Sequence, residues 1–281
     1  MKALHQMTGI SRQALHQYNH WQTNRLCQEE LLCKQATVIR ETHPQMGCRT
    51  MYWMMNEIDI GRDLCEQILL ANGFHVKRPT NYFKTTVAQR IYLFPNLIKG
   101  LILKAINELW QTDITYFHAI GGSVFYIVFI IDVYSRRIVG HCAHDHMRAE
   151  ANLVCLKRAM NLRKDDDITK LIHHSDRGGQ FIDQKYRKAL EQKNIRMSMC
   201  EMAQENAYTE RINGTIKNSY LVGKKIETLS QLNRALNKAV WAYNEEKPHQ
   251  NLPHHMSPIQ FENYLNVTPL STHPTLKIYG A

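Results

Sequence analysis

Hydrophobic and polar positions divide the chain into two parts with different periods. In roughly the first 95 residues, apolar side chains recur at helical spacing in short stretches. Ser11 suits the N-cap of a first helix, residues 28–41 form a second helical stretch, and residues 43–47, with a proline and a glycine, break it. The pattern predicts a small all-α region over residues 1–95.

A further helix is expected to open after Gly61. Leu64, Ile68 and Ala71 fall at helical spacing on one side of it, and Gly73 suits its C-terminal cap. Short helices separated by a glycine turn fit a helix-turn-helix, whose second helix enters the major groove of DNA. They fit a plain helical bundle equally well, and the pattern leaves both interpretations open.

From about residue 105 the pattern changes to strand-like runs. Residues 76–100 show no clear period and predict a linker. Beyond them, three runs separated by short turns predict an antiparallel meander, and alternating helices and strands follow. This order predicts a mixed α/β sheet covered by helices, as in ribonuclease-H-like domains. The expected strands are 110–117, 123–134, 137–146, 168–174 and 195–199, and the expected helices are 149–162, 185–192 and 205–220. We therefore expect a core over residues 96–225 and a helical C-terminal tail over 226–281.

Composition indicates the class of partner. The 281 residues carry a formal net charge of +10, and the pI is near 9.2. Such a balance favours a polyanionic partner, usually nucleic acid and less often an acidic membrane surface. A basic surface that binds no ligand is the alternative that charge alone leaves open.

Cysteine usage and the apolar runs argue against a secreted or membrane protein. The seven cysteines are scattered, odd in number and never form a C-x-x-C pair, which argues against a disulfide framework and a zinc knuckle. The longest apolar run, 124–133, carries Asp132 and is too short to span a bilayer. No apolar run follows the N-terminal lysine, so no signal peptide is expected. A reducing cytoplasmic location is predicted.

Two aspartates stand where the predicted sheet could meet a ligand. Asp113 lies inside the first strand, where burial of a carboxylate is costly unless an arginine, backbone hydrogen bonds or a cation compensates it. Asp176 follows the strand at 168–174, and ligands are usually met at such strand ends. Gly178 and Gly179 next to it allow a tight turn and close approach of the backbone to a ligand.

A third carboxylate, Glu210, lies on the predicted helix 205–220. Asn206, Glu210 and Lys217 are spaced so that they share one helical face. Carboxylate oxygens are the ligands that Mg²⁺ prefers, and two such ions can promote an in-line displacement at phosphorus. Spacing alone also fits a solvated surface helix.

Other acidic and histidine clusters have structural interpretations. Asp132 precedes a Ser-Arg turn and is expected to accept hydrogen bonds from it. Asp165, Asp166 and Asp167 predict a solvated loop. In the pairs His173-His174 and His254-His255, adjacent residues point to opposite faces, so neither pair is expected to chelate one ion.

From Trp110 to about Pro258 the chain resembles the integrase-type core of bacterial insertion-sequence transposases. The most similar group is the second-reading-frame (OrfB) protein of the IS-three family, which has a retroviral-integrase-type DDE core. Residues 28–75 resemble the helix-turn-helix segment ahead of that core, through Pro44-x-x-Gly47-x-Arg49 and Gly61-Arg62. The matching core motifs are Trp110-x-x-Asp113-Ile114-Thr115, Asp132-x-x-Ser135-Arg136-x-Ile138-Val139-Gly140, His174-Ser175-Asp176-Arg177-Gly178-Gly179-Gln180-Phe181, Asn206-x-x-x-Glu210-x-x-x-x-x-x-Lys217 and Tyr243-Asn244-x-x-x-Pro248-His249-x-x-Leu252.

The resemblance implies a DNA transposase, a polynucleotidyl transferase that cleaves 3′ ends and transfers strands during DNA integration and recombination. It implies Asp113, Asp176 and Glu210 as catalytic and metal-binding residues, with two Mg²⁺ or Mn²⁺ ions in each active site. The expected partners are the element's terminal repeats and target DNA, a homo-oligomer on DNA, and a first-frame (OrfA) protein or fusion, in the bacterial cytoplasm near the nucleoid. The residues expected to contact DNA are Asn206, Lys217, Arg177, Arg49 and Arg62.

Two alternatives and one departure accompany this interpretation. A metal-dependent nuclease of ribonuclease-H-like fold without strand transfer would share the acidic triad, and a catalytically inactive DNA-binding regulator would share the fold. The departure is that 33 residues separate Asp176 from Glu210, where the family pattern usually has about 35. Glu201 and Glu205 are therefore rivals for the third position, but neither has the matching asparagine and lysine.

Overall fold

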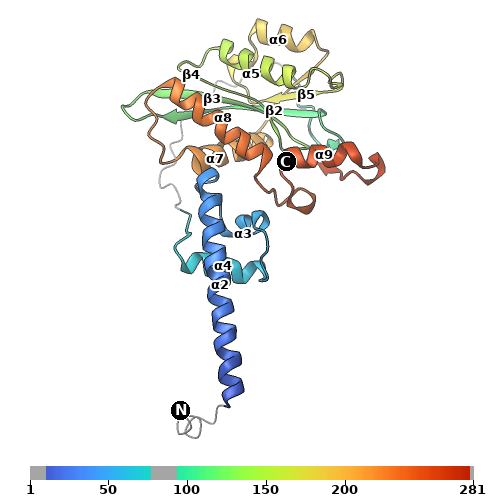
Figure 1. Cartoon of the computed structure of the whole chain (residues 1–281). Coiled ribbons are helices and arrows are strands. Elements are labelled where there is room, and N and C mark those ends of the chain that lie inside the picture. The colour runs from blue at the N-terminus through green and yellow to red at the C-terminus, as the bar shows by residue number, and fades with distance from the viewer. Residues whose placement is uncertain (1–10, 77–93, 279–281) are drawn as a thin grey trace. The chain divides into compact units, whose positions relative to one another are not determined.

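The computed structural model describes residues 11–76 and 94–278, and the chain forms two compact units, Met1–Arg78 and Pro79–Ala281. The first unit is helical and the second is built on a mixed sheet (Figure 1). The predicted fold class, an α/β sheet flanked by helices and preceded by an all-α region, is confirmed. Among the described residues, no helix combines the length and the apolar character needed to cross a bilayer.

The first unit contains one long helix instead of the separate short helices expected before residue 43. The stretch between Ser11 and the predicted break holds no glycine or proline, so the helix continues although no residue of its first half is buried. Ser11 is the N-cap, as predicted, and its hydroxyl accepts a hydrogen bond from the amide of Ala14 at 3.0 Å. The helices are α2 (Arg12–Thr42), α3 (Cys48–Met51), a 3₁₀ turn (Tyr52–Met54) and α4 (Arg62–Ala71).

Helix α4 packs through a different side from the one predicted. Its buried residues are Cys65, Ile68 and Leu69, whereas Leu64 is 45% exposed. They meet Leu32 and other residues of α2 and α3 in a small core. The true side lies about one residue further along the helix, because Cys65 behaves as a small apolar residue. Gly73 follows the helix with φ of +84°, which confirms the predicted C-terminal cap.

The second unit contains the predicted five-stranded mixed sheet. Its strand order is β4-β3-β2-β5-β6, with β2, β3 and β4 antiparallel and with β5 and β6 parallel to β2. A separate pair joins β1 (Ile102–Leu103) to β7 (Leu276–Lys277). The sheet strands are β2 (Leu109–His118), β3 (Val124–Asp132), β4 (Ile138–His144), β5 (Ile172–Ser175) and β6 (Arg196–Met199).

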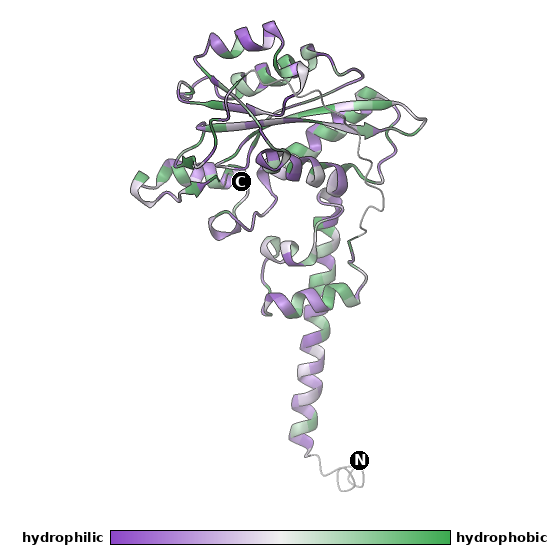
Figure 2. Ribbon diagram, turned by 180° about the vertical axis from the view of Figure 1, so that it is seen from behind, coloured by the Kyte–Doolittle hydropathy of each residue, from purple (hydrophilic) through white to green (hydrophobic). Residues whose placement is uncertain are grey.

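Helices cover both faces of this sheet, because its long strands are apolar on both sides. Along β3, Ile127 and Phe129 face one core and Val128 and Ile130 face the other. Helices α5 and α6 lie over one face, and α7, α8 and α9 lie over the other (Figures 1 and 2). Their bounds are α5 (Ala149–Leu162), α6 (Gln184–Glu191), α7 (Ala207–Thr215) continued by a π-helix (Ile216–Leu221), α8 (Leu229–Glu245) and α9 (Pro258–Val267), with 3₁₀ turns at Gly179–Phe181, Ala203–Asn206, Pro253–His255 and Leu270–Thr272.

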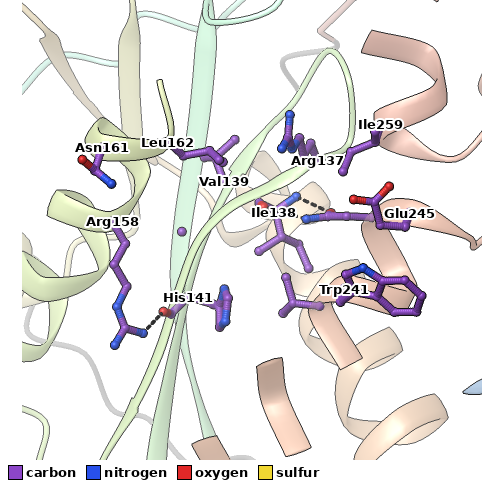
Figure 3. A pocket seen from close by; sticks show the side chains of 13 residues that line it. Arg137, Ile138, Val139, His141, Arg158, Asn161, Leu162, Trp241, Glu245 and Ile259 are labelled. Atoms are coloured by element: carbon purple, nitrogen blue, oxygen red, sulfur yellow. Dashed lines mark hydrogen bonds between the residues drawn. The ribbon is translucent and has the colours of Figure 1, made fainter. Parts of the chain in front are cut away.

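Side chains from the flanking helices cover the outer edge of β4. The amide of Asn244 on α8 bonds both the backbone N–H and the carbonyl of Ile138, each at 2.9 Å. Asn233, also on α8, does the same for Ala143 at 3.3 and 3.4 Å. Arg158 of α5 donates to the carbonyl of His141 at 2.7 Å (Figure 3). A shallow pocket of about 360 Å³ lies along this edge. The asparagines thus fix α8 to the sheet.

A buried ionic network holds α9 against the strand ends. The Glu262 carboxylate pairs with the guanidinium groups of Arg163 and Arg137 and accepts a hydrogen bond from the Ser135 hydroxyl at 2.7 Å. Asp132 beside it accepts hydrogen bonds from the amides of Ser135 at 2.9 Å and Asn107 at 2.6 Å. The predicted structural role of Asp132 in the turn is therefore confirmed.

Candidate active site

Asp113 occupies the middle of β2, where its side chain is largely buried. The amide of Asn213 donates a hydrogen bond to Asp113 Oδ2 at 2.7 Å. Burial raises the pKa of Asp113 to about 7, and the negative charges of Asp176 and, more weakly, of Glu210 contribute to that rise. The three predicted carboxylates therefore lie near enough to one another to interact electrostatically.

Asp176 reaches Asp113 because β5 lies beside β2 in parallel. The pair Thr112 and Ser175 are register partners, so Asp113 and Asp176 each stand one residue beyond that pair. The backbone amide of Gly178 donates to Asp176 Oδ1 at 2.9 Å. A side chain at Gly178 would place its Cβ 2.9 Å from the same oxygen, which explains the glycine in this loop. Burial raises the pKa of Asp176, although the Gly178 hydrogen bond opposes the shift.

Helix α7 and its π-helical continuation present one face to β2. The Asn206 amide donates to the carbonyl of Thr112 at 3.0 Å, and Lys217 Nζ donates to Thr115 Oγ1 at 3.2 Å. Glu210 lies between them in sequence and its side chain is exposed at the rim. The predicted shared face of Asn206, Glu210 and Lys217 is thus directed at the strand that carries Asp113.

Carboxylate oxygens are suitable ligands for Mg²⁺, but the carboxylates of this site do not converge on one point. In the described ranges 11–76 and 94–278, no three His, Cys, Asp or Glu side chains are placed to coordinate a single ion. Mg²⁺ usually takes only one or two protein carboxylates and completes its shell with water and substrate phosphate. The carboxylates of Asp113 and Asp176, held close together against their mutual repulsion, fit that mode of binding.

Comparisons with known proteins identify the family. Residues 104–204 match the protein family described as Integrase core domain, and residues 192–256 match a second family of the same description. A transposase for insertion sequence element IS904 from Lactococcus lactis subsp. lactis is 30% identical over 174 residues, covering 60% of this chain and 67% of the relative. The chain belongs to the insertion-sequence transposases. The family resemblance inferred from the motifs is thereby confirmed.

Further similarity extends over most of the chain. The insertion element IS600 uncharacterized 31 kDa protein of Shigella sonnei is 28% identical over 265 residues, covering 91% of this chain and 96% of that protein. Among solved structures, the HTLV-2 integrase catalytic core domain in complex with magnesium, in its trimeric form, aligns with a TM-score of 0.45 and 20% identity. That alignment covers 59% of this chain and 99% of the integrase chain.

The residues expected to contact DNA are placed in different ways. Asn206 is only 3% exposed, and its carbonyl oxygen accepts from the Thr209 hydroxyl at 2.7 Å while its amide bonds β2. Such an amide is committed to the fold, which argues against the predicted DNA contact. The Arg177 guanidinium donates to the backbone carbonyls that follow β6. In the first unit, Arg49 pairs with Glu66 at 2.6 Å, and the exposed Arg62 pairs with the aspartate that follows it.

The rivals of Glu210 are engaged elsewhere. The Glu205 carboxylate accepts the backbone amides of Glu201 and Met202 at 2.6 and 3.1 Å, and the amide of Asn96 at 2.7 Å. Glu201 forms an ion pair with Lys99 at 2.6 Å. Both carboxylates stabilise the loop that leads into α7.

Asn213 is a site residue that the sequence analysis missed. It is 6% exposed and holds the Asp113 carboxylate directly. The signal was present, since Asn213 follows Asn206 by seven residues and Glu210 by three, on the same helical face. The sequence alone does not show that β2 lies opposite this helical face, so it does not predict the hydrogen bond from Asn213 to Asp113.

The two histidines before Asp176 point to opposite faces of β5, as predicted. His173 Nε2 bonds the hydroxyl of Tyr186 at 2.7 Å on the α6 side. His174 lies between Ser198 Oγ at 2.9 Å and Cys200 Sγ at 3.1 Å. Both rings are buried, and each forms hydrogen bonds with different residues on its own side of the sheet.

Acid should destabilise the protein through His173. Burial, and then the neighbouring His174, lowers the pKa of His173 to about 3. The unfolded chain, with an ordinary histidine pKa of about 6.5, therefore binds more protons, and the free energy of unfolding falls as pH drops from about 6.5 towards about 3. Urea unfolding at pH 7.5 and 5.0 should show a smaller pH effect for His173→Phe than for wild type. The exposed His118→Phe is the control, and equal pH effects in all three proteins would contradict the assignment.

Proposed function

We propose that this protein is a DNA transposase that cleaves the 3′ ends of an insertion element and joins them to target DNA. The observation that carries the proposal is the parallel pairing of β2 with β5, which brings Asp113 and Asp176 together, with Glu210 of α7 close enough to act on the charge of Asp113. Membership of the insertion-sequence transposases supports DNA transposition or integration as the general activity. The order of steps and the residues that perform them belong to the proposal.

Each residue of the site has a distinct role in it. Asp113 and Asp176 would hold divalent Mg²⁺ or Mn²⁺, with Glu210 completing the ligands of a second ion. Asn213 keeps the Asp113 carboxylate turned toward the site through its hydrogen bond. Bound metal ions would activate the attacking oxygen and stabilise the departing one in an in-line displacement at phosphorus. Water and then the freed 3′-hydroxyl serve as nucleophiles, so no covalent protein–DNA intermediate is required.

The positive side chains around the site would position DNA. Lys217 is half-buried and burial lowers its pKa, but its ammonium donates to the neutral Thr115 hydroxyl and can turn to a phosphate. Arg177 shapes the loop after β6, so its part in DNA binding would be indirect. Arg49 and Arg62 would serve DNA binding by the helical unit. Oligomers on paired DNA ends and a first-frame partner are part of the same proposal.

A strand-transfer assay tests the proposal against its closest rival. Labelled duplexes that carry candidate element ends are incubated with the protein, target DNA and Mg²⁺ or Mn²⁺. We expect nicked 3′ ends first and joined products later, and neither without the metal. Cleaved products that never become joined would replace the transposase with a nuclease of the same fold. Binding without any metal-dependent product would instead indicate a DNA-binding regulator.

A further inference from the structure

A second group of cationic side chains lies on the α7 and α8 side of the sheet, apart from the acidic triad. It brings together two motifs that the proposed mechanism leaves unused. Arg136 stands in the turn between β3 and β4, and Lys247 and His249 follow the end of α8. Arg211 on α7 completes the group. Both arginines act electrostatically on Tyr243 and on His249, so residues more than one hundred positions apart meet here.

Aromatic rings hold these cations in place. The Arg136 guanidinium lies 4.1 Å from the centre of the Tyr208 ring, and Lys247 Nζ lies 5.9 Å from that of Tyr243. The rings of Tyr243 and His249 are 4.9 Å apart and nearly perpendicular. Cation–π contacts of this kind orient a cation without neutralising it. The rings therefore fix the Arg136 guanidinium and the Lys247 ammonium in the fold without cancelling their charges.

Two polar atoms of the cluster are buried without a partner. Within the part of the chain that the structure describes, Arg136 Nη1 and His249 Nε2 are inaccessible and have no hydrogen-bond partner. Leaving a buried donor unsatisfied typically costs about 1–3 kcal/mol. A ligand that accepts hydrogen bonds would satisfy both nitrogens.

The charges of the cluster repel one another. Burial, and then Arg211, lowers the pKa of Lys247 to about 8. Burial, followed by Lys247, Arg136 and Arg211, lowers the pKa of His249 well below its ordinary value. Two carboxylates of this region have other partners or surroundings: Glu262 binds Arg163 and Arg137, and Glu245 lines the pocket at the β4 edge (Figure 3). Glu246 precedes Lys247, and Glu210 precedes Arg211. A bound anion would relieve this repulsion.

We infer that Arg136, Arg211, Lys247 and His249 form a binding site for one phosphate group of the DNA backbone. Arginine and lysine side chains are the usual partners of phosphate, and a guanidinium can bind it through two hydrogen bonds. Arg211 directly follows Glu210 on α7, with their Cα atoms about 3.8 Å apart, so the cluster begins on the helix turn that carries the third acidic residue. The inference rests on the proposed function for its DNA partner, and it gives the Ser135-Arg136 and Pro248-His249 motifs a role in holding that DNA.

DNA binding measured against salt concentration tests the site. The double variant Arg211→Gln/Lys247→Gln removes two positive charges from the cluster and keeps the acidic triad. The control Lys188→Gln/Arg196→Gln removes the same charges from exposed positions on α6 and β6. Fluorescence anisotropy with one duplex at salt concentrations from about 50 to 200 mM, a range over which phosphate contacts weaken measurably, gives the slope of log Kd against log salt. Melting temperatures check that all proteins are folded.

We expect the slope for the cluster variant to fall by about 1, with a Kd about ten-fold higher than wild type at low salt, and the control to change much less. Equal slopes for the cluster variant and wild type would overturn the inference. An equal fall of the slope in the control variant would also overturn the inference, because the change would then result from the lower net charge and not from the cluster. A third outcome is that the slope falls in the cluster variant while the wild-type protein forms no metal-dependent product. That result would refute the proposed function and leave the phosphate site standing.

Discussion

Replacing Asp176 by asparagine should reduce metal-dependent DNA cleavage on the order of 10³-fold while DNA binding is retained. The substitution keeps the size of the side chain and the acceptor for the Gly178 amide, but it removes the charge that would hold a divalent ion. Loss of metal stabilisation worth several kcal/mol in the transition state corresponds to a rate change of this size. Initial rates of nicking at saturating DNA, with Mg²⁺ and with Mn²⁺, provide the measurement.

The matched control for this variant is Asp165→Asn in the exposed loop before β5. It removes the same charge and should leave nicking and strand transfer unchanged. Cleavage by Asp176→Asn at the wild-type rate would exclude Asp176 from the metal site. If Asp176→Asn also bound DNA much more weakly than the control, the aspartate would have a structural role instead.

Replacing Glu262 by alanine should lower the free energy of unfolding of the sheet-containing unit by about 3–5 kcal/mol. Glu262 is 5% exposed and is the common partner of Arg163 and Arg137. Without it, the Arg137 guanidinium would lose its ion-pair partner, and the almost wholly buried Arg163 would keep only Asp166, at 3.4 Å, as a paired carboxylate. The midpoint of urea unfolding at pH 7.5, followed by tryptophan fluorescence and circular dichroism, measures the change.

Glu191→Ala supplies the comparison, because it removes a carboxylate from an ion pair exposed to solvent. Glu191 and Arg187 are 3.9 Å apart on α6, and both side chains are well exposed. Such a pair contributes about 0.3–0.5 kcal/mol, so its loss should barely move the midpoint. A Glu262→Ala midpoint as close to wild type as that of Glu191→Ala would show that the buried network does not secure α9.

Local patterns predict most of the second unit, because its strands are continuous apolar runs bounded by clear turn residues. The long apolar strands β2 and β3, with turns at Gly121-Gly122 and Ser135-Arg136, left little choice of secondary structure. The first unit was less predictable. The large apolar residues of 12–27, Leu15, Tyr18, Trp21 and Leu26, are exposed and pack in no core, so the lack of a breaker is the clearest sign that α2 is continuous. On α4, the exposed Leu64 falls at helical spacing with Ile68, so the pattern predicts the wrong buried side.

The positions of the acidic residues could be predicted from the sequence. Their proximity in space, and the hydrogen bonds that hold them, could not. Asp113 stands out in sequence because a charge inside an apolar strand is unusual, and Asp176 because it directly follows a strand in a glycine-containing loop. Their proximity depends on the parallel pairing of β2 with β5, which no local pattern specifies. For the same reason Asn213 escaped notice and Asn206 was expected to contact DNA, although both amides bond β2. Hydrogen bonds between distant segments become visible only when the segments are placed.

The covering of the β4 edge by Asn233 and Asn244 bears on how the protein behaves when many copies gather on DNA. An open strand edge is a template on which a strand of another chain can add, and such addition leads to aggregation. At Ile138 and Ala143 the outward amides and carbonyls are already bonded to asparagine side chains. A strand from a second copy would have to displace these asparagines before it could pair with β4 at Ile138 or Ala143.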